Sequence, residues 1–208
     1  MYLGLKAEHD RNFENKLHDL MVGGILQLWK AFPDHKVLQK MIGTVEKLFE
    51  INDVRVVEDG YKIRPTYHVT SMFIGGGKPK TESKIYQNFE VGKIVNVSVR
   101  ALLFVPGKIL TGVCFPDADV ENRFPHMTLL LGKWPAKNSN MALEFTCSDS
   151  KQPFHSLYNY ALSEGKGGRD HASFLEDCLF EKKEKASAYF IVLEKPIVFE
   201  SECHCYEQ

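Results

Sequence analysis

Apolar residues in the first quarter of the chain recur every three or four positions, which is the spacing that places side chains on one face of a helix. This pattern predicts one helix over residues 12–32 and a second whose apolar stripe runs from Val37 to Phe49. Gly23-Gly24 weakens the first helix locally, and Pro33 ends it because proline lacks the amide hydrogen that a helix needs. A short opening strand is expected over residues 1–6.

From Val54 the apolar period changes from helical spacing to alternation, which indicates strands. Asp59-Gly60 and Pro106-Gly107 are turn sequences, and each predicts a hairpin between the strands that flank it. A short helix is expected within residues 81–90. The predicted strands cover residues 54–63, 65–74, 93–105, 108–115 and 126–131.

The last third of the chain mixes both patterns. Residues 133–151 are polar and are expected to form a loop or an edge strand, whereas residues 154–162 and 173–186 are predicted to be helical. Residues 187–201 predict a strand pair or one bent strand, because Pro196 cannot donate to a central ladder. The whole of residues 1–208 is therefore predicted to be one α+β domain of mixed α/β layers.

Composition restricts the class of protein. A formal charge of −1 over 208 residues argues against a general nucleic-acid coat protein. Five irregularly spaced cysteines, an odd number, fit a reducing compartment better than a secreted disulfide scaffold. The N-terminus does not resemble a signal peptide, and no apolar run has the length of a membrane span. We expect a soluble intracellular protein, cytoplasmic or nuclear, without membrane contact.

Two short segments carry most of the chemical information, YHVTSMFIGGGK at residues 67–78 and FPHMTLLLGKW at residues 124–134. Each contains His-x-Thr at the start of an apolar run that ends in glycine and lysine. Alternate residues of a strand share a face, so His68 would lie with Thr70 and His126 with Thr128. Two such strands side by side would surround one small volume with two imidazoles and two hydroxyls.

That arrangement suits a phosphate group, since one imidazole can act as base and the other as acid while the hydroxyls donate to its oxygens. His171-Ala172-Ser173 has the same spacing but lies next to a predicted helix, so no role is assigned to it. The alternative is that the two motifs belong to unrelated strands, each with histidine and threonine on its polar face.

The paired His-x-Thr motifs resemble those of the two-histidine (2H) phosphoesterase superfamily, which includes LigT-like RNA phosphodiesterases and cyclic phosphodiesterases. The resemblance implies a bilobal, pseudo-two-fold fold with a cleft between two antiparallel-rich sheets flanked by helices, each lobe supplying one motif. It implies a metal-independent phosphoesterase that hydrolyses a 2′,3′-cyclic phosphate, a 2′-5′ phosphodiester or a related RNA end. His68, Thr70, His126 and Thr128 would be the catalytic residues. The motifs lie closer together in sequence than is usual in the family, which indicates a divergent branch.

Residues that flank the motifs are candidates for binding the substrate. Tyr67, Phe124 and Trp134 can stack on a base, as aromatic side chains do in single-stranded RNA recognition, although each also suits an ordinary core position. Lys78 and Lys133 follow their motif strands at similar offsets and can attract phosphate.

Two further segments are discounted. The GGGK segment lacks the earlier glycine and the following Ser/Thr of a phosphate-binding loop, and Cys203-His204-Cys205 lacks a second ligand pair for zinc. We therefore expect no metal and no cofactor. The expected partner is an RNA end, a short oligonucleotide or a nucleotide, bound by a monomer. The alternatives are a catalytically weak RNA- or nucleotide-binding module that uses the same cleft, and a scaffold protein in which the motifs are incidental.

Overall fold

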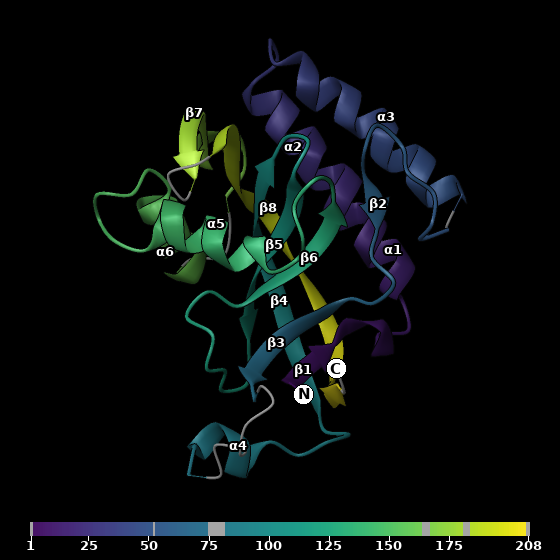
Figure 1. Ribbon diagram of the computed structural model, residues 1–208, viewed down its shortest axis with the longest axis vertical. Coiled ribbons are helices and arrows are strands. Elements are labelled where there is room, and N and C mark those ends of the chain that lie inside the picture. The colour runs from purple at the N-terminus through teal and green to yellow at the C-terminus, as the bar shows by residue number, and fades with distance from the viewer. Residues whose placement is uncertain (1, 52, 75–81, 164–166, 181–183, 207–208) are drawn as a thin grey trace.

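The strands form one antiparallel sheet that closes on itself. The computed structural model describes residues 2–51, 53–74, 82–163, 167–180 and 184–206. Within the sheet the order is β1-β3-β6-β5-β4-β8-β7, and β1 also pairs with β8, so six of the strands make a ring while β2 joins β6 (Figure 1). The strands are β1 Tyr2–Lys6, β2 Lys62–Ile63, β3 His68–Phe73, β4 Ile94–Val105, β5 Ile109–Pro116, β6 His126–Leu131, β7 Ala172–Phe180 and β8 Glu184–Tyr206.

Helices cover both faces of this sheet (Figure 1). Helices α1 to α3 pack on one face, α5 and α6 pack on the other, and the short α4 lies beyond one end. A π-helical turn, Asp19–Gly23, joins α1 to α2 at the weakness that Gly23-Gly24 predicted. The helices are α1 Phe13–His18, α2 Gly24–Ala31, α3 Lys36–Ile51, α4 Lys84–Asn88, α5 Asn138–Cys147 and α6 His155–Ser163.

Strand β4 separates two hydrophobic cores. Leu102 and Phe104 belong to the core under α1–α3, whereas Leu103 and Val105 belong to the core under α5 and α6. Alternate side chains of a strand point to opposite faces, so a strand covered on both sides requires a continuous apolar run. The mixed α/β fold with an antiparallel sheet and flanking helices is thus confirmed, and all eight described strands belong to one hydrogen-bonded sheet.

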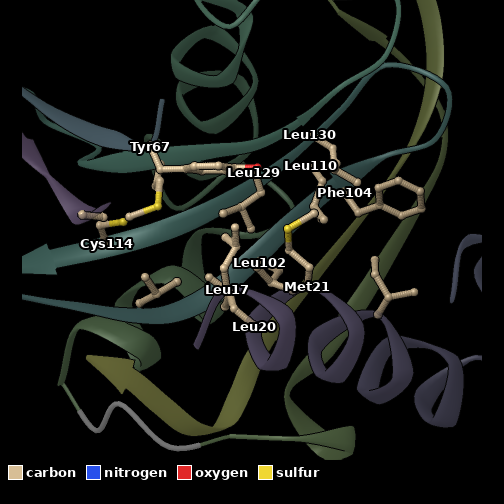
Figure 2. Packing of buried hydrophobic residues seen from close by; sticks show 14 of the residues in the cluster. Leu17, Leu20, Met21, Tyr67, Leu102, Phe104, Leu110, Cys114, Leu129 and Leu130 are labelled. Atoms are coloured by element: carbon tan, nitrogen blue, oxygen red, sulfur yellow. The ribbon is translucent and has the colours of Figure 1, made fainter. Parts of the chain in front are cut away.

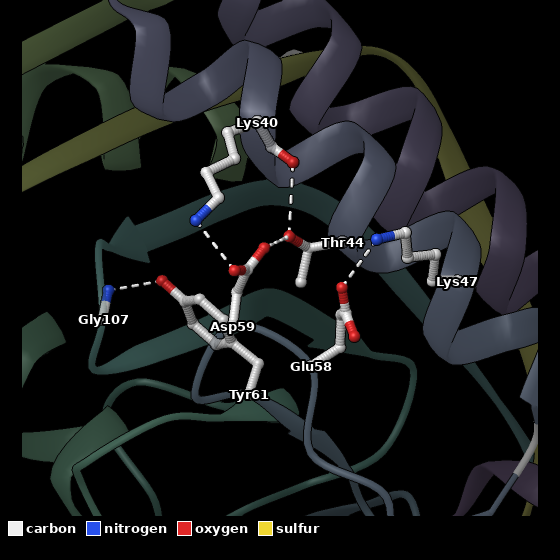
Figure 3. Close-up of polar contacts among 7 residues, drawn as sticks. All are labelled: Lys40, Thr44, Lys47, Glu58, Asp59, Tyr61 and Gly107. Atoms are coloured by element: carbon white, nitrogen blue, oxygen red, sulfur yellow. Dashed lines mark hydrogen bonds and ion pairs between the residues drawn. The ribbon is translucent and has the colours of Figure 1, made fainter.

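The turn at Asp59-Gly60 forms as predicted, but the two-stranded hairpin expected around it does not, because residues 54–57 form no strand and β2 pairs with β6. Both residues have positive φ, 51° and 81°, as in a type I′ turn, and Glu58 bridges to Tyr61. The Asp59 carboxylate accepts a hydrogen bond from the Thr44 hydroxyl at 2.6 Å and pairs with Lys40 at 2.7 Å (Figure 3). The turn is thereby fixed to α3, and the chain leaves it through β2 toward the first motif strand.

Two predictions about the last third of the chain were wrong. Residues 133–151, expected as a loop or edge strand, contain helix α5. Residues 173–186, expected as a helix, contribute to strands β7 and β8. The bent-strand prediction is confirmed: in β8, Val192 lies opposite Ala101 and Ile197 opposite Val99, so the ladder is irregular around Pro196. Among the described residues, no helix is both long and apolar enough to cross a bilayer.

Candidate functional site

The two His-x-Thr motifs lie on neighbouring antiparallel strands. Val69 of β3 is paired with Met127 of β6, and both side chains are fully buried in the core under α1–α3. The residues on either side of this pair must face the other way. The register therefore sets His68 beside Thr128 and Thr70 beside His126, so that each imidazole has the hydroxyl of the other motif as its cross-strand neighbour.

All four motif side chains line one cavity of about 320 Å³. Strands β3 and β6 supply the motif side chains, the position after β2 supplies Arg64, and the segment that leads into α5 supplies further lining residues. The other lining residues are Arg64, Phe73, Asn122, Ala136, Lys137 and Asn140.

His126 is held in a defined orientation. Its Nδ1 lies 2.8 Å from the carbonyl oxygen of Phe124, and a carbonyl can only accept, so Nδ1 carries a hydrogen. In the neutral ring this leaves Nε2 as the nitrogen that can take up a proton. Burial lowers the pKa of His126, the Phe124 carbonyl raises it, and the nearby Arg64 charge lowers it further.

His68 is held by aromatic rings instead. Its ring centroid lies 5.1 Å from that of Tyr2 and 4.8 Å from that of Tyr206, and these two tyrosines stack on each other at 4.7 Å. Its buried Nδ1 has no hydrogen-bond partner in the part of the chain that is described. Burial first, then the charges of Arg64 and His126, lower the pKa of His68 to about 4.

A buried chain of hydroxyls fixes Thr128. Ser139 of α5 lies 2.9 Å from the Thr128 hydroxyl and 2.8 Å from that of Thr111 on β5. Ser139 and Thr111 are fully buried and Thr128 is only 8% exposed. The helix that the sequence did not predict therefore orients one of the two predicted phosphate-binding hydroxyls.

The cavity is electropositive. Arg64 and Lys137 contribute cations, and no carboxylate is found among the described residues that line the cavity. Burial lowers the pKa of Arg64, but a guanidinium remains charged at any physiological pH. An anion is the ligand that these charges and the threonine hydroxyls favour.

The predicted aromatic platforms are not at the cavity. Tyr67 is buried in the core under α1–α3 because it directly precedes His68 and faces the other way (Figure 2). That burial raises the pKa of Tyr67 to about 12, and its hydroxyl accepts from the Arg64 amide at 3.3 Å. Trp134 is buried against Phe180 and donates to Glu184 at 2.7 Å.

The remaining predicted residues are distributed differently. Phe124 is buried beside Tyr158, and its contribution to the cavity is the carbonyl that holds His126. Lys133 is exposed at the β4–β5 turn, where its amide donates to the Gly107 carbonyl, and it does not line the cavity. Lys78 lies outside the described residues.

Sequence reasoning missed four polar residues of the cavity, which are Arg64, Asn122, Lys137 and Asn140. Arg64 stands four positions before His68, so its closeness to the motif was the one available signal. Lys137 and Asn140 depend on helix α5, and Asn122 lies in the loop that enters β6. Their positions are set by tertiary structure.

Comparison with known proteins identifies no family. No protein-family model matches the chain, and no curated protein matches it. A crystal structure described as a fungal RNA kinase aligns with a TM-score of 0.47 and 12% identity, over 97% of this chain and 44% of that one. The chain thus spans less than half of that protein's length, and similarity at this level does not establish a shared function.

Proposed function

We propose that the cavity is the active site of a metal-independent phosphoesterase that hydrolyses a 2′,3′-cyclic phosphate, or a related 2′-5′ phosphodiester, at the end of an RNA or nucleotide. The observation that carries this proposal is one small cavity with two imidazoles, two threonine hydroxyls, two cations and no lining carboxylate in the described chain. Carboxylates are the usual protein ligands of Mg²⁺. The proposal therefore assigns charge neutralisation to Arg64 and Lys137.

Binding places the phosphate between the two strands. Arg64 and Lys137 attract its negative charge, and the hydroxyls of Thr70 and Thr128 donate to the non-bridging oxygens. Ser139 orients the Thr128 hydroxyl in advance, so little reorganisation is needed when charge develops in the transition state.

Catalysis then requires two proton transfers. One neutral imidazole takes a proton from water as its oxygen forms a bond to phosphorus, and the other, as imidazolium, gives a proton to the ribose oxygen as the P–O bond breaks. The atoms balance: one water is consumed, one phosphomonoester is formed, and the histidine pair exchanges its protonation states. The bound anion favours the imidazolium, because it offsets the Arg64 charge that disfavours protonation.

The test is hydrolysis of a 2′,3′-cyclic nucleotide in the presence of EDTA. His68→Ala and His126→Ala should each lower kcat at least about 100-fold, and the double variant should lose little more, because the pair acts as one unit. Since both pKa values lie below 6.5 in the free protein, the maximum of kcat/KM is expected on the acid side of pH 6.5.

His171→Ala is the matched control, since His171-Ala172-Ser173 has the motif spacing but stacks on Tyr160 away from the cavity. Retained hydrolysis in both motif variants would refute the proposal. Nucleotide binding that both variants abolish, without turnover by the wild type, would instead identify the recognition module that is the alternative reading of these motifs.

A further inference from the structure

A second, larger groove adjoins the catalytic cavity. Its volume is about 990 Å³, against about 320 Å³ for the cavity. Asn122 lines both, and Phe124 and Pro125, the two residues before His126, line the groove. Ligand sites span roughly 300–1,000 Å³, so the cavity alone suits one small group and the groove offers room for considerably more.

The lining of the groove includes an arginine packed on an aromatic ring. The guanidinium carbon of Arg100 on β4 lies 4.9 Å from the ring centroid of Phe115 on β5. Its Nε donates to Ser98, and its Nη1 donates to the carbonyls of Ala161 and Leu162 at the end of α6. In the described chain nothing accepts from Nη2, so Arg100 is held in place with one amino group still available.

Apolar side chains are exposed along the same groove. Leu162 at the end of α6 is 54% exposed and Val198 of β8 is 42% exposed, and both line the groove. Leaving large apolar side chains in water is unfavourable, and here they lie beside cations. Arg123 adds a second guanidinium, with one bond to the Ser148 carbonyl, and Asp117 is the single acidic residue among the described lining residues.

A groove that joins arginines, an aromatic ring and apolar side chains suits a nucleic acid single strand, because bases stack on aromatic rings and guanidinium planes and cover apolar side chains, while phosphates pair with the charges. A free phosphate has no apolar part to cover Leu162 and Val198. We propose that this groove binds the nucleotides that flank the scissile phosphate, so that the substrate is a single-stranded RNA end of two or more nucleotides. The proposal rests on the proposed function for the position of the phosphate.

The experiment compares kcat/KM for a tetranucleotide and for a mononucleotide, both ending in a 2′,3′-cyclic phosphate. The wild type should prefer the tetranucleotide at least about tenfold, since one stacked base contributes that much. Leu162→Glu places a negative charge, the same sign as that of the RNA phosphates, where we propose that a base lies. It should reduce the preference for the tetranucleotide about tenfold. Ile51→Glu is the matched control, because Ile51 is similarly exposed (49%) at the end of another helix and does not line the groove.

Binding is measured separately from turnover, by fluorescence anisotropy of a labelled tetranucleotide with a 3′-phosphate. Leu162→Glu should weaken this binding about tenfold, and Arg123→Gln should reduce the slope of log K against log salt by about 0.7. Binding sensitive to Leu162→Glu without any hydrolysis would support the groove while refuting the proposed function. Hydrolysis that needs both motif histidines, with no length preference and no effect of Leu162→Glu, would overturn the groove proposal alone.

Discussion

The two partly buried histidines of the cavity are held by different contacts, and the difference has a measurable consequence. His126 keeps a hydrogen bond to the Phe124 carbonyl, which partly offsets the effect of burial on its pKa. His68 packs against Tyr2 and Tyr206 and has no such bond among the described residues, and its pKa falls from 6.5 to about 4. Between pH 4 and pH 6.5, His68 therefore binds a proton in the unfolded chain but not in the folded chain.

The sign of the effect on stability follows from that difference. A histidine whose folded pKa is lowered contributes its full stability above pH 6.5 and loses it as the pH falls toward 4. We expect the free energy of unfolding to fall between pH 7 and pH 5, with about 1–2 kcal/mol of the fall due to His68 after allowance for its partial exposure. Urea denaturation of wild type and His68→Asn at both pH values measures this share. Equal pH dependence in the two proteins would contradict it.

At the scale of elements, the motif strands and the hairpin around Pro106-Gly107 were predictable because their alternation is local. Helix α5 was not, although its buried positions 139, 142, 143, 146 and 147 have helical spacing. Three of them are Ser139, Thr146 and Cys147, and the two hydroxyls are buried only because they are hydrogen-bonded. Hydrophobic periodicity cannot detect a helix whose buried face is small and polar.

Strand β7 was not predicted because its apolar residues have the spacing of a helix. Its apolar residues Phe174, Leu175, Cys178 and Leu179 have helical spacing, yet they lie in a strand. The register shifts between Leu175 and Cys178, and Asp177 has a positive φ of 47°. A bulge restarts the alternation of a strand, so the period of two is hidden in the sequence.

The adjacent glycines that join α1 to α2 provide a paired test of helix packing. Gly23 and Gly24 both have helical backbone angles, so only their surroundings differ. A Cβ on Gly23 meets nothing within 4 Å, whereas one on Gly24 would lie 2.1 Å from Leu102, which is fully buried. Gly23→Ala should stabilise the protein by about 0.5–1 kcal/mol, and Gly24→Ala should destabilise it by about 1–3 kcal/mol. Chemical denaturation measures both, and equal shifts would contradict the close approach of α2 to β4.

At the scale of the whole molecule, β1 closes the ring of strands, because it pairs with β3 on one side and with the last part of β8 on the other. Lys6 lies opposite both His68 and Glu202, and Tyr2 lies opposite both Phe73 and Tyr206. Strand β3, which carries the first motif, therefore pairs with β1, and β1 pairs in turn with the last part of β8 (Figure 1). The tyrosines that pack on His68 come from these same two strands, so the cavity depends on the closure of the ring.

Because β1 and β8 are paired, we expect a circular permutant, in which these strands are linked and the chain is opened elsewhere, to form the same ring of strands. Tyr2 and Tyr206 lie opposite each other, and paired Cα atoms lie about 5 Å apart, so a short Gly/Ser linker can connect these two positions. The new ends can be placed between Val54 and Arg55, which are exposed and precede β2. We expect this circular permutant to unfold cooperatively, within about 10 °C of the wild-type Tm, and to match the wild type in the proposed hydrolysis assay, because every strand of the ring is intact. A second permutant, opened between Leu102 and Leu103 in the buried middle of β4, should not fold. Calorimetry compares the two, and failure of the first to fold would show that β1 and β8 are not joined as the register requires.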